Sequence, residues 1–379
     1  MSHAPGAALS RRHSAVRDAL HALGLDSLVV TAPANITYLT NFTGSSAIVI
    51  VEPDRIALLT DFRYRTTIEE TRGTAHECPA LELVVVEGAY DAALARALAS
   101  GAPRRVGFDA ASLTVARHNW LRASLTAQAS AVELVATERV VERLRVVKDD
   151  YEIETLREAA RRLSRVAASV ADAVRRGTTE REVALAIDVR LRQAGFSRSA
   201  FDTIVASGPN SALPHARPTE RTITEGDLVV LDFGGVYDSY CVDLTRTVSV
   251  GKADARVKEV YGAVREAQVC AVAAVGPGAS RFAIDAAARD ALSARGLGEA
   301  FGHGTGHGLG IEVHEDPRVT RRRPDVDAGD EAVAPGMVFT IEPGAYLPGW
   351  GGVRIEDDVL VTNSGVEVLT EGSTDLLEI

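Results

Sequence analysis

The second half of the chain repeats one order of predicted elements, and this repeat constrains the fold more than any other feature of the sequence. Apolar residues at helical spacing predict helices over 152–176 and 179–195, and two apolar strands follow over 228–234 and 240–248. The second set comprises predicted helices over 256–275 and 281–295 and predicted strands over 337–342 and 353–361. Two helices followed by strands, twice in succession, indicate an α+β domain made of two similar halves.

Short strands alternate with helices in the N-terminal part of the chain. The predicted helices cover 11–24, 66–72, 90–99 and 115–124, and the predicted strands cover 27–31, 47–51, 56–60, 83–86 and 105–109. This alternation is typical of an α/β domain. The charged stretch V-V-E-R-L-R-V-V-K-D-D-Y then precedes the long helix. We therefore predict a smaller α/β domain over residues 1–145 and a larger α+β domain over residues 146–379.

The charge balance excludes one broad class of function. The sequence holds 41 Lys and Arg against 52 Asp and Glu, a net charge of −11, whereas a general nucleic-acid binder needs a basic face. Three widely spaced cysteines form no readable disulfide framework or thiolate zinc site. No apolar run reaches the length of about 18 residues that suggests a membrane-spanning helix. We therefore expect a cytoplasmic protein that binds neither membranes nor nucleic acids.

Two acidic residues interrupt the first pair of strands. Because side chains alternate between the faces of a strand, Asp232 shares a face with Leu228 and Val230, and Asp243 shares one with Thr245. A short turn around 237–239 would bring Asp232 opposite Asp243. Burying a carboxylate among apolar residues is costly unless it meets a cation. A single aspartate of this kind can also be a hydrogen-bonded structural residue, so neither one identifies a site alone.

The second pair of strands carries acids in the same way. Glu342 is the last residue of the strand predicted over 337–342, and it shares a strand face with Val338 and Thr340 in V-F-T-I-E-P-G. Glu356 lies in V-R-I-E-D-D, on the same strand face as Arg354 and Asp358. Each half of the domain therefore supplies two strand-borne acids beside apolar residues.

A stretch rich in glycine and histidine lies between these strand pairs. The sequence F-G-H-G-T-G-H-G-L-G-I-E-V-H over 301–314 contains His303, His307 and His314 among five glycines. Such a stretch is either a flexible loop or a packed site in which glycine lets the backbone approach a ligand. Beyond His118 the chain has one further histidine, His215, and it also lies near a motif. This clustering favours a metal or substrate-oxygen site.

The charges of these candidates indicate a metal site with two ions. The candidate carboxylates are Asp232, Asp243, Glu342 and Glu356. Together with one imidazole they make five ligands, and their charge of −4 would be cancelled by two divalent cations. Carboxylate-rich sites suit Mn²⁺, which we expect here, with Co²⁺ or Zn²⁺ as alternatives.

The motifs L-D-F-G-G…V-D-L-T-R-T, G-H-G-T-G-H-G-L-G-I-E-V-H-E, T-I-E-P-G and V-R-I-E-D-D resemble those of the pita-bread metallopeptidases, in the branch of aminopeptidase P and prolidase. The acids of the first motif are eleven residues apart and the last two histidines seven apart, as in that family. The resemblance covers about residues 150–379, and the preceding part resembles the creatinase-type N-terminal domain. It implies a pita-bread catalytic domain after a creatinase-like domain. All five ligand positions are filled, unlike those of creatinase itself.

The resemblance also implies a role for each site residue. The implied metal ligands are Asp232, Asp243, His307, Glu342 and Glu356. Asp243 and Glu356 would bridge two ions, and Glu342 would also carry a proton towards the departing proline nitrogen. The other implied catalytic residues are His215, His303, His314 and Arg354. The histidines would donate hydrogen bonds to the scissile carbonyl and the tetrahedral intermediate, and the arginine would pair with ligand carboxylates or the substrate end.

Several functions are compatible with these motifs. The leading hypothesis is an Xaa-Pro aminopeptidase that acts on proline-containing peptides as a homodimer, and the segment T-D-F-R-Y over 60–64 favours that branch. The close alternative is an Xaa-Pro dipeptidase, which differs in the room beyond the proline. A methionine aminopeptidase is disfavoured because such enzymes usually lack a large N-terminal domain. A non-catalytic binding module on the same fold is a distant alternative, which the intact ligand set disfavours.

Overall fold

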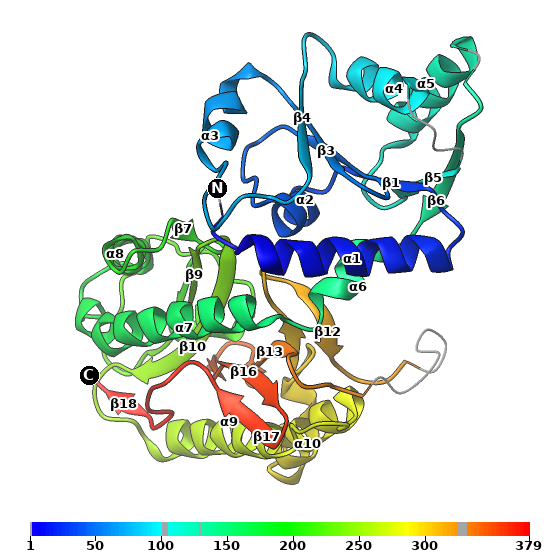
Figure 1. Ribbon diagram of the computed structural model, residues 1–379. Coiled ribbons are helices and arrows are strands. Elements are labelled where there is room, and N and C mark those ends of the chain that lie inside the picture. The colour runs from blue at the N-terminus through cyan, green and yellow to red at the C-terminus, as the bar shows by residue number, and fades with distance from the viewer. Residues whose placement is uncertain (1, 101–104, 129, 324–331) are drawn as a thin grey trace. The chain divides into compact units, whose positions relative to one another are not determined.

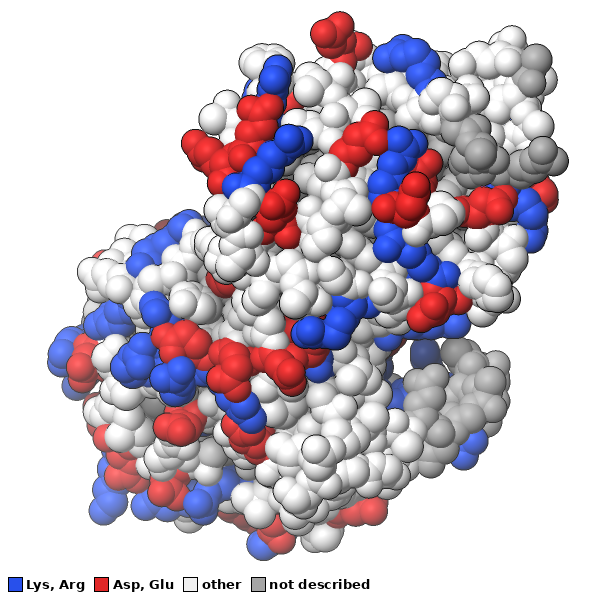
Figure 2. Space-filling model, in the orientation of Figure 1, with Lys and Arg blue, Asp and Glu red and all other residues white. Residues whose placement is uncertain are grey.

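The computed structural model describes residues 2–100, 105–128, 130–323 and 332–379, and the chain divides into two compact units (Figure 1). Unit 1 is Met1–Arg145 and unit 2 is Val146–Ile379. In the described residues no helix is both long enough and apolar enough to cross a bilayer. On the face shown in Figure 2, acidic and basic side chains are interspersed, and no broad area of one sign is visible.

Unit 1 is built on a six-stranded sheet in the order β4-β3-β2-β1-β5-β6. Its strands are β1 (Ser27–Val30), β2 (Ile48–Val51), β3 (Ile56–Thr60), β4 (Leu81–Val85), β5 (Arg105–Asp109) and β6 (Glu133–Thr137). Only β2 runs antiparallel to its neighbours. The helices are α1 (Gly6–Ala22), α2 (Pro33–Thr40), η1 (Phe62–Tyr64), α3 (Arg65–Glu70), α4 (Tyr90–Ser100), α5 (Val115–Ala127) and α6 (Val140–Arg145). The sequence patterns predicted the strands before β6 and missed β6, α2 and α6.

Unit 2 contains two five-stranded sheets and one strand pair. Its helices are α7 (Asp150–Val170), η2 (Ala171–Ala173), α8 (Glu180–Gln193), η3 (Gly208–Ala212), α9 (Ala255–Ala273), α10 (Arg281–Ala294) and η4 (Gly298–Ala300). The first sheet has β7 (Arg198–Ser199), β8 (Ile204–Ser207), β9 (Leu228–Tyr237), β10 (Tyr240–Ser249) and β18 (Leu377–Glu378). The second has β11 (Gly306–Gly308), β12 (Glu315–Val319), β13 (Val338–Ile341), β16 (Asp357–Thr362) and β17 (Gly365–Val368). The separate pair is β14 (Gly344–Leu347) and β15 (Gly351–Arg354).

The long helix predicted over 152–176 is shorter than expected. Asp149 caps α7 with Glu152 in a capping box, and the helix ends at Val170 before the single turn of η2. The next helix begins with the capping box of Thr179 and Glu182, as predicted. One apolar face of α7, including Leu156 and Leu163, belongs to the same buried cluster as Leu231 of β9. This packing occupies one face of β9, so residues of the other face, such as Asp232, are available to a site.

The hairpin of β9 and β10 has a different register from the one predicted. Its two-residue turn is Asp238-Ser239, and both residues have positive φ, 45° and 73°, as the right-handed twist of a tight hairpin requires. Asp232 therefore lies opposite Thr245, and Asp243 lies opposite Gly234. The two aspartates are diagonal neighbours on one face of the hairpin. The prediction that they lie directly opposite each other is wrong, because Asp232 pairs with the residue two positions after Asp243.

The two large sheets of unit 2 meet at a seam between β10 and the segment around Glu356. The strand predicted over 353–361 is broken there, because β15 pairs with β14 whereas β16 pairs with β13. The amide of Glu356 donates to the carbonyl of Thr245 at 3.1 Å, and the amide of Asp243 donates to Oδ2 of Asp358 at 3.0 Å. The seam thus brings acids of both halves of the sequence together.

Candidate metal centre

One cleft of about 590 Å³ collects every site residue that the sequence predicted. Those residues are His215, Asp232, Asp243, His303, His307, His314, Glu342, Arg354 and Glu356. They come from both large sheets of unit 2, from the separate strand pair and from the segments that join the strands.

Asp243, His307 and Glu356 form the tightest group of potential ligands. One carboxylate oxygen of each acid and one ring nitrogen of the histidine all lie within 4.8 Å of one another. Nδ1 of His307 lies 3.1 Å from the carbonyl oxygen of Gly308 and donates to it, which leaves the lone pair of Nε2 facing the carboxylates. A backbone carbonyl that binds the second ring nitrogen is the usual arrangement of a metal-binding histidine.

The glycines on either side of His307 allow the strands to approach closely. A Cβ atom on Gly306 would lie 1.8 Å from the carbonyl oxygen of Thr340, and one on Gly308 would lie 2.1 Å from that of Asp316. His307 itself is buried on β11, with 7% of its surface exposed. The glycine-rich stretch is therefore a packed strand here, as the site interpretation requires, and the flexible-loop interpretation is wrong for this segment.

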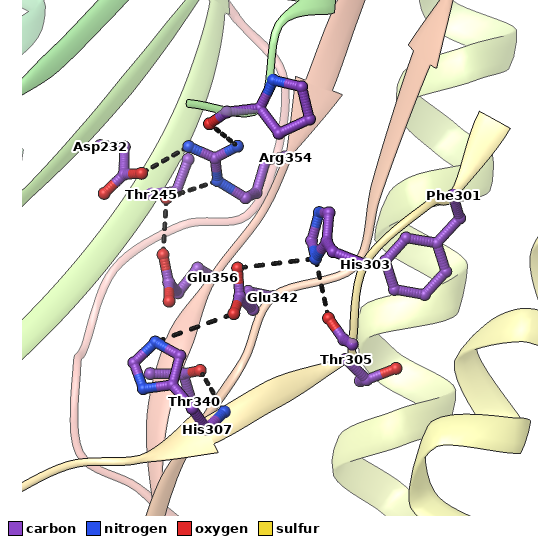
Figure 3. Close-up of polar contacts among 12 residues, drawn as sticks. Asp232, Thr245, Phe301, His303, Thr305, His307, Thr340, Glu342, Arg354 and Glu356 are labelled. Carbon is purple, nitrogen blue, oxygen red and sulfur yellow. Dashed lines mark hydrogen bonds and ion pairs between the residues drawn. The ribbon is translucent and has the colours of Figure 1, made fainter. Parts of the chain in front are cut away.

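Glu342 lies between two histidines just after β13. Its Oε1 is 3.8 Å from Nε2 of His307, and its Oε2 is 4.0 Å from Nδ1 of His303 (Figure 3). His303 is fixed on both sides, because Nδ1 donates to the carbonyl of Gly304 at 2.8 Å and Nε2 accepts from the hydroxyl of Tyr346 at 2.9 Å. In this arrangement His303 has no second N–H to offer to a substrate.

Asp232 is held by Arg354 and lies outside the tight group. The guanidinium of Arg354 donates to Oδ2 of Asp232, to the hydroxyl of Thr245 at 3.1 Å and to the hydroxyl of Tyr346 at 2.8 Å. Thr245 in turn donates to Oε2 of Glu356 at 2.6 Å. Figure 3 shows this chain of contacts from Asp232 to Glu356 on one side of Glu342. One arginine therefore orients two of the candidate ligands, one directly and one through a hydroxyl.

Burial and mutual repulsion make these carboxylates hard to ionise. Burial raises the pKa of Asp243 and of Glu356 well above their usual values, and neighbouring carboxylates raise both further. Burial also raises the pKa of Glu342 to about 8, although Arg354 opposes this. In contrast, burial lowers the pKa of His307 to about 3, so its imidazole is neutral at pH 7 and has the form that binds metals.

The donor set fits divalent cations. Oδ1 of Asp232 and Oδ1 of Asp243 are buried, and neither accepts a hydrogen bond from the residues that the structure describes. Arg354 supplies one positive charge against the four carboxylates, and no other described Lys or Arg forms an ion pair with them. Buried charges are normally paired or bind metals. Bound divalent cations would give these two buried oxygens a partner and would balance the excess negative charge of the carboxylates.

Sequence reasoning missed Tyr346, which contacts both Arg354 and His303. No strand pattern links Tyr346 to Glu342, because β13 ends at Ile341 and Tyr346 belongs to β14 of the separate strand pair. It also missed Arg318, which lines the same cleft four residues after His314.

Two domain families match the chain. The model of metallopeptidase family M24 matches residues 154–363, and the model of the creatinase/prolidase N-terminal domain matches residues 12–147. A Bacillus subtilis relative named as an uncharacterized peptidase, YqhT, is 38% identical over 362 residues, which is 96% of this chain and 98% of that protein.

Solved structures resemble the whole chain. An Xaa-Pro dipeptidase from Bacillus anthracis has a TM-score of 0.90 at 36% identity, covering 98% of this chain and 100% of that one. An X-Pro aminopeptidase from Thermotoga maritima has a TM-score of 0.85 at 32% identity, covering 96% of this chain and 100% of that one. These matches confirm the predicted fold class, a pita-bread catalytic domain preceded by a creatinase-like domain.

Proposed function

Because the chain belongs to metallopeptidase family M24, we propose that this metal-dependent peptidase is an Xaa-Pro dipeptidase, which splits a dipeptide at the bond before proline. From the sequence motifs, the aminopeptidase is the leading hypothesis and the dipeptidase is the close alternative. Relatives named as Xaa-Pro dipeptidases, from Bacillus anthracis and other organisms, support the second, and the Thermotoga maritima neighbour keeps the first as the alternative to test.

The position of Arg318 is the observation that favours the dipeptidase over the aminopeptidase. Its side chain is exposed at the cleft, and within the described part of the chain its guanidinium has no hydrogen-bond or ion-pair partner. Burial lowers the pKa of His314, and the positive charge of Arg318, which lines the same cleft, lowers it further. Arginine binds carboxylates well. In a dipeptide the C-terminal carboxylate belongs to the residue next to the cleaved bond, where Arg318 would meet it.

Five residues of the cleft would hold the metal ions. They are Asp232, Asp243, His307, Glu342 and Glu356. Bound divalent cations would lower the pKa of a water molecule and polarise the substrate carbonyl, and the abundance of carboxylates supports Mn²⁺ as the native metal. Arg354 would keep Asp232 and, through Thr245, Glu356 in the orientation that binding requires.

The other polar residues would move the proton and hold the substrate. Glu342 faces both His303 and His307, and a carboxyl group there can pass a proton to the proline nitrogen as it leaves. Because both nitrogens of His303 are already bonded, we assign it to the orientation of Glu342. His215 and His314, whose side chains are exposed in the cleft, are the histidines left to donate hydrogen bonds to the carbonyl oxygen. The homodimer and the cytoplasmic location stay predictions from the sequence.

A competition between three peptides tests the proposal. The Mn²⁺-loaded protein receives Ala-Pro, Ala-Pro-Ala and Ala-Ala-Ala in one mixture, and mass spectrometry follows the products. We expect Ala-Pro to be cut fastest, and an Asp243→Asn preparation shows what any contaminating peptidase contributes. Faster release of alanine from Ala-Pro-Ala would make the protein an aminopeptidase. Cleavage of Ala-Ala-Ala alone would refute the preference for proline, and no cleavage with Mn²⁺, Co²⁺ or Zn²⁺ would favour a binding module.

A further inference from the structure

A single buried carboxylate holds both ends of the segment that carries His215. We call residues 207–219 the His215 loop. Glu180 lies in the first turn of α8 and is fully buried. Its Oε1 accepts from the amide and the hydroxyl of Ser207, both at 2.7 Å. Its Oε2 accepts from the amide and the hydroxyl of Thr219, at 2.9 and 2.6 Å. The two oxygens of one side chain therefore fix the beginning and the end of the loop.

Further contacts fix the interior of the loop from both sides. The side-chain amide of Asn210 donates to both oxygens of Glu180, at 3.0 and 3.2 Å. On the side of the metal centre, the carbonyl of Pro214 accepts from Arg354 at 3.3 Å. Between these anchors, His215 and Arg217 line the cleft. The loop thus connects Glu180, which does not line the cleft, with the arginine that orients the candidate metal ligands.

Only a carboxylate satisfies the donors that surround this position. Both oxygens face a backbone N–H, so the amide group of a glutamine would bring its own N–H against one of them. Burial alone would raise the pKa of Glu180, but the hydrogen bonds from Thr219 and Ser207 outweigh it, and the pKa lies below its usual value. The carboxylate is ionised at neutral pH, and each hydrogen bond that it accepts is strengthened by its charge.

We propose that Glu180 is a positioning residue for the reaction: by closing the His215 loop at its base, it places His215 and Arg217 at the cleft. This inference rests on the proposed function, because it assumes that His215 donates to the substrate carbonyl. Glu180 does not touch the substrate and would act only through the loop.

The first test compares Glu180→Gln with Glu182→Gln. Glu182 is a matched control, because it lies in the same helical turn and accepts hydrogen bonds only from Thr179 among the described residues. With Ala-Pro as substrate we expect Glu180→Gln to lower kcat/KM by about 10- to 100-fold, as the loss of supporting contacts commonly does, while the Mn²⁺ content is unchanged. Glu182→Gln should stay within about twofold of the parent. If Glu180→Gln does not fold, Thr219→Val, which removes one donor, should still show a several-fold loss.

The second test separates positioning from a general loss of stability. His215→Ala is made in the parent and in Glu180→Gln, and we expect it to cost much less in the second background, because the histidine is already misplaced there. Equal costs in both backgrounds would refute the proposal.

Amide hydrogen exchange over residues 207–219 measures the order of the loop without any substrate. The exchange rate should increase in Glu180→Gln and stay the same in Glu182→Gln. An unchanged exchange rate in Glu180→Gln would also refute the proposal. If the parent cuts no Xaa-Pro peptide, the proposed function fails, while the exchange result still decides whether Glu180 holds the loop.

Discussion

Nε2 of His307 lies 4.0 Å from Oδ2 of Asp243, although the two residues belong to different sheets of unit 2. Asp243 comes from β10 in the first half of the unit, and His307 comes from β11 in the second. Glu356, the third member of the tight group, lies at the seam where the two sheets meet. The tight group therefore combines residues of both halves of unit 2, and neither half alone contains all three of them.

Replacing Asp243 with asparagine should remove metal and activity together. The change keeps the shape of the side chain but removes one charge from a buried group of carboxylates. We expect the metal content to fall below half of the parent value and kcat/KM to fall by at least about 100-fold, since even residues that only support ligands cost 10- to 100-fold. Elemental analysis, turnover and circular dichroism measure these effects. Asp188→Asn, outside the cleft, is the control, and unchanged turnover in Asp243→Asn would refute the metal mechanism.

The metal-free protein should lose stability as the pH rises from 7 to 8.5. The pKa of Glu342 is about 8 in the folded site against 4.5 ordinarily, so the folded state binds this proton more tightly than the unfolded state. The stabilisation is therefore complete only below about pH 4.5, declines as the pH rises above that value, and is fully lost once the pH has passed 8. For this group alone the loss over the interval is about 1 kcal/mol.

The histidines do not reverse that trend. Burial lowers the pKa of His303 to about 4 and that of His307 to about 3, so their contribution grows as the pH rises through 6.5 and changes by only about 0.3 kcal/mol in total from pH 7 to 8.5. Thermal unfolding after treatment with a chelator measures the effect. Saturating Mn²⁺ should raise the unfolding temperature and weaken its dependence on pH, because the ions bind the ionised carboxylates. A metal-free protein that becomes more stable towards pH 8.5 would contradict the prediction.

Tyr346→Phe should slow the reaction without removing the metal. The hydroxyl accepts from Arg354 and donates to His303, so its loss frees one side of the histidine that faces Glu342. We expect kcat to fall by about 10-fold, with a loss of stability of about 1 kcal/mol. Tyr261→Phe removes a hydroxyl that donates to the carbonyl of Thr374, away from the cleft, and is the matched control. Equal turnover in both variants would show that Tyr346 only stabilises the fold.

Arg318→Met should weaken the binding of dipeptides in particular. If Arg318 pairs with the C-terminal carboxylate, KM for Ala-Pro should rise by about 10-fold, which corresponds to about 1.4 kcal/mol. KM for the amide of Ala-Pro, which has no carboxylate, should not change. Arg321→Met is the control, since Arg321 is exposed and does not line the cleft. A similar rise of KM for the amide would rule out recognition of the carboxylate.

Much of the site could be read from local patterns. Alternation along a strand placed Asp232 and Asp243 on faces that both line the cleft, because the side-chain period of a strand does not depend on its partners. The capping box at Thr179 marked the start of α8 for the same local reason. The predicted register of the hairpin differs from the observed one by two residues. The register depends on which two residues adopt positive φ in the turn, and the strand pattern does not specify them.

By itself, the sequence determined which side chains are available and on which strand face each acid lies, since spacing and period are properties of the chain alone. The tertiary structure decided which of them meet. Joining the two sheets at Thr245 and Glu356 brought Asp243 to His307, paired Asp232 with Arg354 and added Tyr346, which no motif had marked. It also made Glu180 the anchor of a distant loop. These contacts join residues far apart in the sequence, and only the packing of whole sheets and helices determines such distances.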